Sequence, residues 1–227
     1  MADGAVPVIL WQEGGQPRSA RWRSEAGTAP PRRVELADDS LKADTAYGLA
    51  AQGCALLWRG DFQNARQLLQ AMARRADRRP AKAGATPAEA FHLHRHAQAQ
   101  RARTLGLLLV PLDADYAIPL RRAPDVRAAC LEAYGPGEGP AVVSLRELQG
   151  LIGAHEWRKK GVPVAALGER IHPYYGVYSP LRGEYVDLVA EAPLPAAALA
   201  FDIGTGSGVL AALLARRGVE RVVATDR

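Results

Sequence analysis

Residues 197–226 read AALAFDIGTGSGVLAALLARRGVERVVATD, and this stretch decides the fold expected for the C-terminal part of the chain. Its first five residues form a continuous apolar run, as in a buried parallel strand. A glycine-rich loop follows, and then an amphipathic stretch from Val209 to Arg217, which Gly218 ends. A second apolar run, 221–225, leads to Asp226. The pattern predicts a strand, a loop, a helix, a second strand and a closing acid, which together form a parallel β-α-β unit.

The glycine loop and the closing acid predict a nucleoside site. Glycines at 204, 206 and 208 allow the backbone to turn sharply and to approach a ligand, and a helix N-terminus presents free N–H groups. Asp226 lies 24 residues after Asp202, and the acid that binds ribose in β-α-β sites lies about 20 residues on. A dinucleotide fingerprint reads G-x-G-x-x-G, and Val209 does not fit it.

The sequence Asp202-Ile203-Gly204-Thr205-Gly206-Ser207-Gly208 resembles motif I of the class I S-adenosylmethionine (SAM) methyltransferases. In that family the loop wraps the methionine part of SAM, and the acid that ends the second strand holds the ribose. The resemblance therefore implies SAM as the cofactor. It implies that the methionine part lies against Asp202, Gly204, Thr205, Gly206, Ser207 and Gly208, and that Asp226 binds the ribose.

The segment before this motif, 176–189, resembles the lead-in of the glutamine N5 methyltransferases, which modify release factors and ribosomal proteins. Pro180, Arg182 and Glu184 echo the family's proline-centred turn. The resemblance favours N-methylation of a protein glutamine amide. The related "small domain" methyltransferases of rRNA and DNA bases share this layout, so a nucleic-acid acceptor is the alternative. Tyr174, Tyr175 and Tyr178 either pack on the sheet or touch the ligand.

The resemblance covers about the last fifty residues and ends one residue after Asp226. The five further strands of the family, its adenine-side acid and its Asn-Pro-Pro-Tyr-type loop lie outside it, so no catalytic residue is assigned. We expect a methyltransferase truncated after its second strand, and an inactive fragment that binds SAM weakly or not at all. The alternative of another class is a non-catalytic module that binds RNA or protein and carries a vestigial nucleoside site.

For residues 1–160 the sequence predicts a mainly helical (α+β) substrate-recognition region, followed by the incomplete Rossmann-like α/β unit in 161–227. Residues 1–37 are expected to be partly disordered after a strand at 6–11. Two helices are expected in 44–79, with a break at 60–61. Further expectations are a helix cap at 38–40, a helix from Thr86, strands at 105–111 and 116–119, a helix at 125–134, a capping box at 144–147 and a helix at 184–191.

Net charge is +5, and it gathers in one window. Residues 62–104 hold nine Lys or Arg against two acids, whereas 151–227 hold nine against eight. Such a window attracts phosphate backbones, although a solvated helix face gives the same pattern. His92, His94 and His96 alternate, so successive histidines point to different faces of a helix, and no metal is expected. Two cysteines, expected to be buried free thiols, predict a cytoplasmic protein, and no apolar run approaches the ~20 residues of a membrane span.

Overall fold

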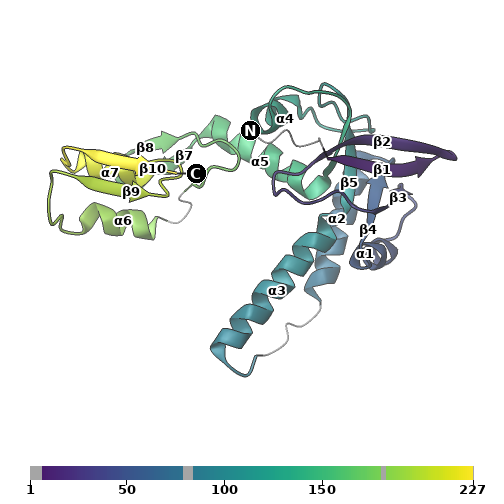
Figure 1. Ribbon diagram of the computed structural model, residues 1–227, viewed down its shortest axis with the longest axis horizontal. Coiled ribbons are helices and arrows are strands. Elements are labelled where there is room, and N and C mark those ends of the chain that lie inside the picture. Colours follow the sequence, from purple (N-terminus) through teal and green to yellow (C-terminus); the bar gives the residue numbers. More distant parts are fainter. Residues whose placement is uncertain (1–6, 79–83, 180–182, 227) are drawn as a thin grey trace. The chain divides into compact units, whose positions relative to one another are not determined.

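The computed structural model describes residues 7–78, 84–179 and 183–226. The chain divides into two compact units, Met1–Gly150 and Leu151–Arg227, and the division falls within one helix, α5 (Leu145–Lys160). Figure 1 labels most elements of both units. Among the described residues, no helix combines the length and the apolar character that crossing a membrane requires.

The first unit is built on a six-stranded mixed sheet, with the strand order β1-β2-β6-β5-β4-β3. The β1–β2 and β5–β6 pairs are antiparallel, and the other neighbouring pairs are parallel. The two end strands, β1 and β3, also contact each other, so the sheet is nearly closed and barrel-like. The strands are β1 (Val8–Glu13), β2 (Gln16–Arg23), β3 (Arg33–Ala37), β4 (Cys54–Trp58), β5 (Leu108–Leu112) and β6 (Ala141–Ser144).

The expected N-terminal helical domain is therefore wrong, because this unit is an α/β fold whose sheet starts at the N-terminus. Residues 12–37, expected as loop, contain most of the β1–β2 hairpin and all of β3. The side chains of β2 are mostly polar, and half of them are exposed, so this strand shows no apolar alternation. The usable signal was the two-residue turn Gly14-Gly15, whose φ angles of 59° and 75° suit a hairpin between strands.

The first of the two helices expected in 44–79 corresponds to two separate elements in the structure. The structure has α1 (Ala43–Ala51) and then the strand β4, which contains Leu56 and Leu57. All five residues of β4 are buried, and a short, fully apolar run does not distinguish a buried strand from a buried helix. The expected cap at 38–40 is a turn, in which Asp38 accepts hydrogen bonds from the backbone N–H and the hydroxyl of Ser40, and α1 begins after Lys42.

Two helix starts were predicted correctly by local chemistry. Helix α2 (Phe62–Asp77) buries the apolar stripe of its sequence against the rest of the unit, and Asp61 caps it by accepting a hydrogen bond from the backbone N–H of Gln63. Helix α3 (Pro87–Leu105) begins as expected, with the Thr86 hydroxyl accepting from the backbone N–H of Glu89. Each cap satisfies an amide that the helix itself leaves unpaired.

Later in this unit the sequence predictions are mixed. The expected helix at 125–134 is present as α4 (Arg127–Tyr134), but 116–119 is not a strand, and Tyr116 has a φ of 66°. Helix α5 forms without the expected capping box. Ser144 ends β6, and its buried hydroxyl has no partner, whereas Glu147 accepts a hydrogen bond from the Tyr134 hydroxyl.

Side chains from five strands fill the interior of the sheet. The cluster comprises Ile9, Trp22, Ala55, Leu57, Leu109 and Val142. Cys54 and Cys130 are free and buried, as expected, and burial raises the pKa of the Cys130 thiol to about 12. Outside this interior, Arg59 follows β4 and forms two hydrogen bonds, of 2.8 and 2.7 Å, with the carboxylate of Glu13 at the end of β1. This ion pair joins the edge strand β1 to the end of β4, the strand beside the other edge strand, β3.

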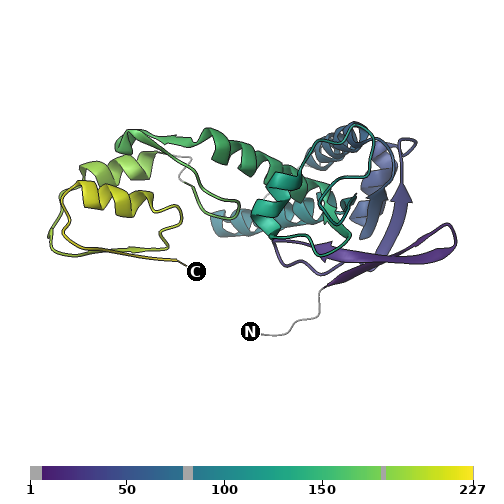
Figure 2. The ribbon, with the colours of Figure 1, turned by 90° about the horizontal axis from the view of Figure 1, so that it is seen from above.

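The second unit contains the expected β-α-β order. Strands β9 (Ala200–Ile203) and β10 (Val222–Thr225) are parallel, and α7 (Val209–Arg216) connects them. Helix α6 (Glu184–Glu191) precedes them, together with a small hairpin of β7 (Val162–Val164) and β8 (Glu169–Ile171) around the 3-10 turn η1 (Ala165–Leu167). Figure 2 shows α6 and α7, coloured green to yellow, on one side of the β9–β10 ribbon. The apolar core lies on the helix side and comprises Val164, Leu167, Val186, Val209 and Leu213.

Candidate nucleoside-binding site

The glycine loop between β9 and α7 requires glycine for a conformational reason. Gly204, Gly206 and Gly208 have φ angles of 78°, 54° and 77°, in the left-handed region that other residues rarely adopt. A Cβ atom added at Gly204 or Gly208 would meet no atom within 4 Å, so the loop is open at these two positions. The alternating glycines of the sequence therefore correspond to three left-handed backbone conformations in the structure.

Asp202 fastens this loop to the helix. The residue is buried, and its Oδ2 atom accepts hydrogen bonds from the Thr205 hydroxyl, at 2.6 Å, and from the backbone N–H of Ala211, at 3.0 Å. A carboxylate near a helix N-terminus also has a favourable interaction with the helix dipole. Both contacts lie within the loop and the first turn of α7, so the carboxylate of Asp202 stabilises the conformation of the loop.

The structure brings Asp226 and the glycine loop together. The backbone N–H of Gly206 donates to the carboxylate of Asp226, 20 residues further along the chain. Just before Asp226, the carbonyl oxygen of Thr225 accepts from the backbone N–H groups of Gly204 and Thr205, at 2.8 and 3.0 Å. The end of β10 and the loop therefore form one hydrogen-bonded surface.

The lead-in segment also reaches the loop. The carbonyl oxygen of Tyr178 accepts a hydrogen bond from the backbone N–H of Ser207, at 3.0 Å, and would lie 2.9 Å from a Cβ atom at Gly206. The Tyr178 ring is largely exposed, and its hydroxyl lies 3.4 Å from that of Tyr185. Desolvation, and then this hydrogen bond, raise the pKa of Tyr185 to about 12. Sequence reasoning missed this carbonyl contact, because a backbone oxygen leaves no signal in residue type.

Other residues of the resemblance are placed as follows. Glu184 begins α6, and Tyr174 packs against the guanidinium of Arg158, 4.0 Å from its ring centre, with its hydroxyl accepting from Arg158. Pro180 and Arg182 lie outside the described residues.

Within the described part of the chain, no group of three or more His, Cys, Asp or Glu side chains is placed to hold a metal ion.

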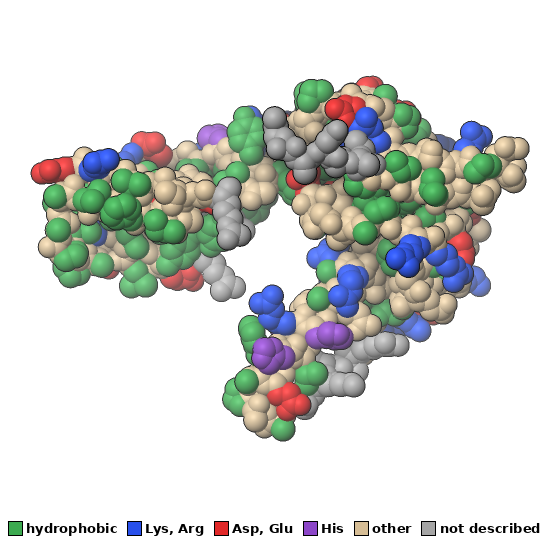
Figure 3. Space-filling model, viewed as in Figure 1, with side chains coloured by type: hydrophobic (Ala, Val, Ile, Leu, Met, Phe, Trp, Pro, Cys, Tyr) green, Lys and Arg blue, Asp and Glu red, His purple; other side chains and the backbone are tan. Residues whose placement is uncertain are grey.

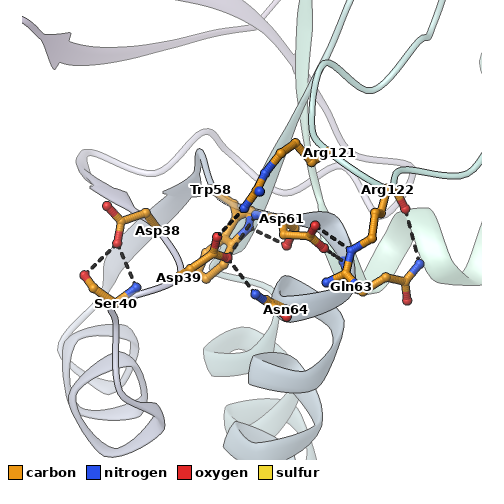
Figure 4. Close-up of polar contacts among 9 residues, drawn as sticks. All are labelled: Asp38, Asp39, Ser40, Trp58, Asp61, Gln63, Asn64, Arg121 and Arg122. Atoms are coloured by element: carbon orange, nitrogen blue, oxygen red, sulfur yellow. Dashed lines mark hydrogen bonds and ion pairs between the residues drawn. The ribbon is translucent and has the colours of Figure 1, made fainter.

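A second polar cluster lies in the first unit, at the carboxyl ends of β3 and β4, which is where ligands bind in many α/β folds (Figure 4). Asp39 accepts from the backbone N–H of Asp61 and from the side chains of Asn64 and Arg121. Asp61 accepts from Arg122 Nε at 2.6 Å, and this contact lowers the pKa of the Asp61 carboxyl. The carboxylates are occupied by contacts within the chain, so the cluster serves to fix the loop after β5 onto the start of α2.

Comparison with known proteins gives no family model that matches the chain and no curated protein that matches it significantly.

Proposed function

We propose that the second unit forms the methionine and ribose side of a SAM site, and that the protein is a SAM-dependent methyltransferase. The contact between the Gly206 amide and the Asp226 carboxylate carries this proposal, because it joins the glycine loop of one parallel strand to the acid of the next. When bound, SAM supplies an electrophilic methyl group. The residues present fit its two polar ends: open backbone at Gly204 and Gly208 and an acceptor for ribose hydroxyls at Asp226.

A packing argument supports SAM rather than a dinucleotide in this proposal. In a dinucleotide fingerprint the third glycine allows close packing of the helix on the strand. Position 209, where this glycine would stand, is a valine whose side chain is buried in the core of the second unit.

The acceptor is assigned by resemblance alone. We favour a protein glutamine amide in a release factor or ribosomal protein, with an rRNA or DNA base as the second candidate. The candidate of another class is a non-catalytic module that binds RNA or protein and retains a vestigial nucleoside site. Finding an Asn-Pro-Pro-Tyr-type loop encoded further along the same reading frame would support the enzyme and its nitrogen chemistry.

Calorimetry tests the cofactor. The full product of the reading frame is titrated with SAM, with S-adenosylhomocysteine and with NAD⁺. We expect binding of the first two and none of NAD⁺. Asp226→Ala removes the acceptor of a ribose hydrogen bond, worth about 1.5–3 kcal/mol at a charged group, so SAM affinity falls about 10- to 150-fold.

Glu220→Ala is the matched control, since Glu220 is an exposed acid just before β10 and only its backbone N–H makes a described hydrogen bond, to Ala197. Equal weakening by both variants would mean that Asp226 acts only through net charge. Binding of NAD⁺ in preference to SAM would overturn the cofactor, and failure to bind either ligand would favour the vestigial module.

A further inference from the structure

The positive charge of the first unit gathers on its helices. Figure 3 shows Lys and Arg side chains, with the histidines of α3, on the helical part of this unit. The described parts of α2 and α3, together with the residue after α2, contain seven arginines and two acids, Asp77 and Glu89. The arginines are Arg66, Arg74, Arg75, Arg78, Arg95, Arg101 and Arg103.

Internal ion pairs neutralise only part of this charge. Arg75 pairs with Asp44 of α1 at 2.8 Å, and Arg101 pairs with Asp77 at 2.7 Å. Within the described ranges, Arg74, Arg78 and Arg103 are exposed and have no carboxylate partner. These three guanidinium groups keep all their donors for a ligand, and guanidinium binds phosphate oxygens with good geometry.

A hollow of about 460 Å³ lies between α1 and the end of α2. Its lining includes Tyr47, Gly48, Gln52, Arg75 and Arg78. The side chains offer an aromatic ring, an amide and two cations, which are the groups that bind the base and the phosphate of a nucleotide. The volume is in the range of small-ligand sites. Asp44 also lines the hollow, and its carboxylate pairs with Arg75, so Arg78 is the cation of the lining without a described carboxylate partner.

Helix α3 extends this surface. Residues 85–100 are exposed, apart from the partly buried Leu93. Phe91 is 57% exposed, and the guanidinium of Arg95 lies 5.9 Å from the centre of its ring. Most of this helix is therefore exposed to solvent. Its arginine beside an exposed aromatic ring offers contacts for unpaired bases as well as for phosphates.

We propose that helices α1–α3 bind a single-stranded nucleic acid, with one nucleotide in the hollow beside Tyr47 and neighbouring phosphates on Arg74, Arg78 and Arg103. Charge complementarity identifies the partner as polyanionic. The aromatic ring in the hollow and the exposed Phe91 favour a nucleic acid over an acidic protein, which offers no base to stack. The inference is independent of the proposed SAM site, since no residue of the second unit takes part.

The test is fluorescence anisotropy of the 227-residue chain with a labelled 20-nucleotide oligouridylate at 50 and 200 mM salt. Three phosphate contacts on a single strand give a salt slope of about −2, so we expect affinity to fall about 20-fold between these concentrations. Arg74→Gln with Arg78→Gln should weaken binding about tenfold, and Tyr47→Leu by a similar factor through loss of stacking. Tyr47→Phe, which keeps the ring, should bind like the unchanged chain.

The matched control is Arg18→Gln with Arg32→Gln, which removes two exposed arginines away from these helices. Circular dichroism confirms that each variant is folded. If the control weakened nucleic-acid binding equally, the affinity would depend only on net charge, and the proposed site would be overturned. Absent or salt-independent binding would overturn the proposal. The proposal would also fail if polyglutamate competed fully for the site while Tyr47→Leu had no effect on binding, because this result would indicate an acidic protein partner.

Discussion

The ion pair between Glu13 and Arg59 should contribute measurably to the stability of the first unit. It joins β1 to the end of β4 across 46 residues, and the indole N–H of Trp11 donates to the same carboxylate. The hydrogen bonds from Arg59, and then from Trp11, lower the pKa of Glu13 from 4.5 to about 2. The perturbation is Glu13→Gln, which keeps the shape of the side chain and removes its charge.

The size of the effect follows from the exposure of the two side chains. A pKa lowered by this amount corresponds to about 3 kcal/mol in favour of the charged form. About a third of each side chain is exposed, and solvent screening reduces the contribution of such pairs. We therefore expect the free energy of unfolding to fall by about 1–2 kcal/mol at pH 7.

The sign of the pH dependence is fixed by the direction of the pKa change. Because the folded pKa lies below the unfolded one, the contribution of Glu13 is complete above about pH 5 and is lost as pH falls towards 2. The measurement is urea unfolding followed by tryptophan fluorescence, to which Trp11, Trp22 and Trp58 of this unit contribute. The difference between Glu13→Gln and the unchanged chain should shrink over that range.

The control for Glu13→Gln is Asp113→Asn, which changes an exposed carboxylate with no described side-chain hydrogen bond. Its stability should match that of the unchanged chain at every pH. A double-mutant cycle of Glu13→Gln with Arg59→Gln should give a coupling energy close to the loss at pH 7. A stability difference that stays constant from pH 7 to pH 3, or a coupling energy near zero, would refute this reasoning.

Three further changes have defined outcomes. Leu57→Ala leaves a cavity inside the six-stranded sheet and should lower the free energy of unfolding by about 2–5 kcal/mol in urea titration, whereas Leu10→Ala, on the exposed side of β1, should change it little. Thr86→Ala removes the cap of α3 and should cost about 0.5–2 kcal/mol locally, seen as faster hydrogen exchange of the first turn of α3 but not of α2. Gly206→Ala places a Cβ atom 2.9 Å from the Tyr178 carbonyl at a φ of 54°. In the full product of the reading frame it should abolish SAM binding while far-ultraviolet circular dichroism is unchanged, and retained binding would mean that the loop tolerates rearrangement.

The candidate site was largely predictable because its determinants are local. A left-handed φ is a property of single residues, so the glycines at 204, 206 and 208 are enough to mark the loop in the sequence. The spacing to Asp226 then places an acid beside the loop, since adjacent parallel strands end at the same edge of a sheet. The contacts of Tyr178 were not predictable, because its carbonyl oxygen is a group that every residue possesses.

Sequence by itself determined the break before α2, the cap of α3, the β-α-β order of the second unit and the free, buried cysteines. Only the tertiary structure decided that the first unit is a mixed, nearly closed sheet. Strand β2 is held between β1 and β6, and β6 lies more than a hundred residues further along the chain. Its exposed side chains carry no periodic pattern, so the strand is specified by backbone pairing and by the burial of Trp22. Long-range pairing of this kind depends on which strands meet, and no local window of sequence contains that information.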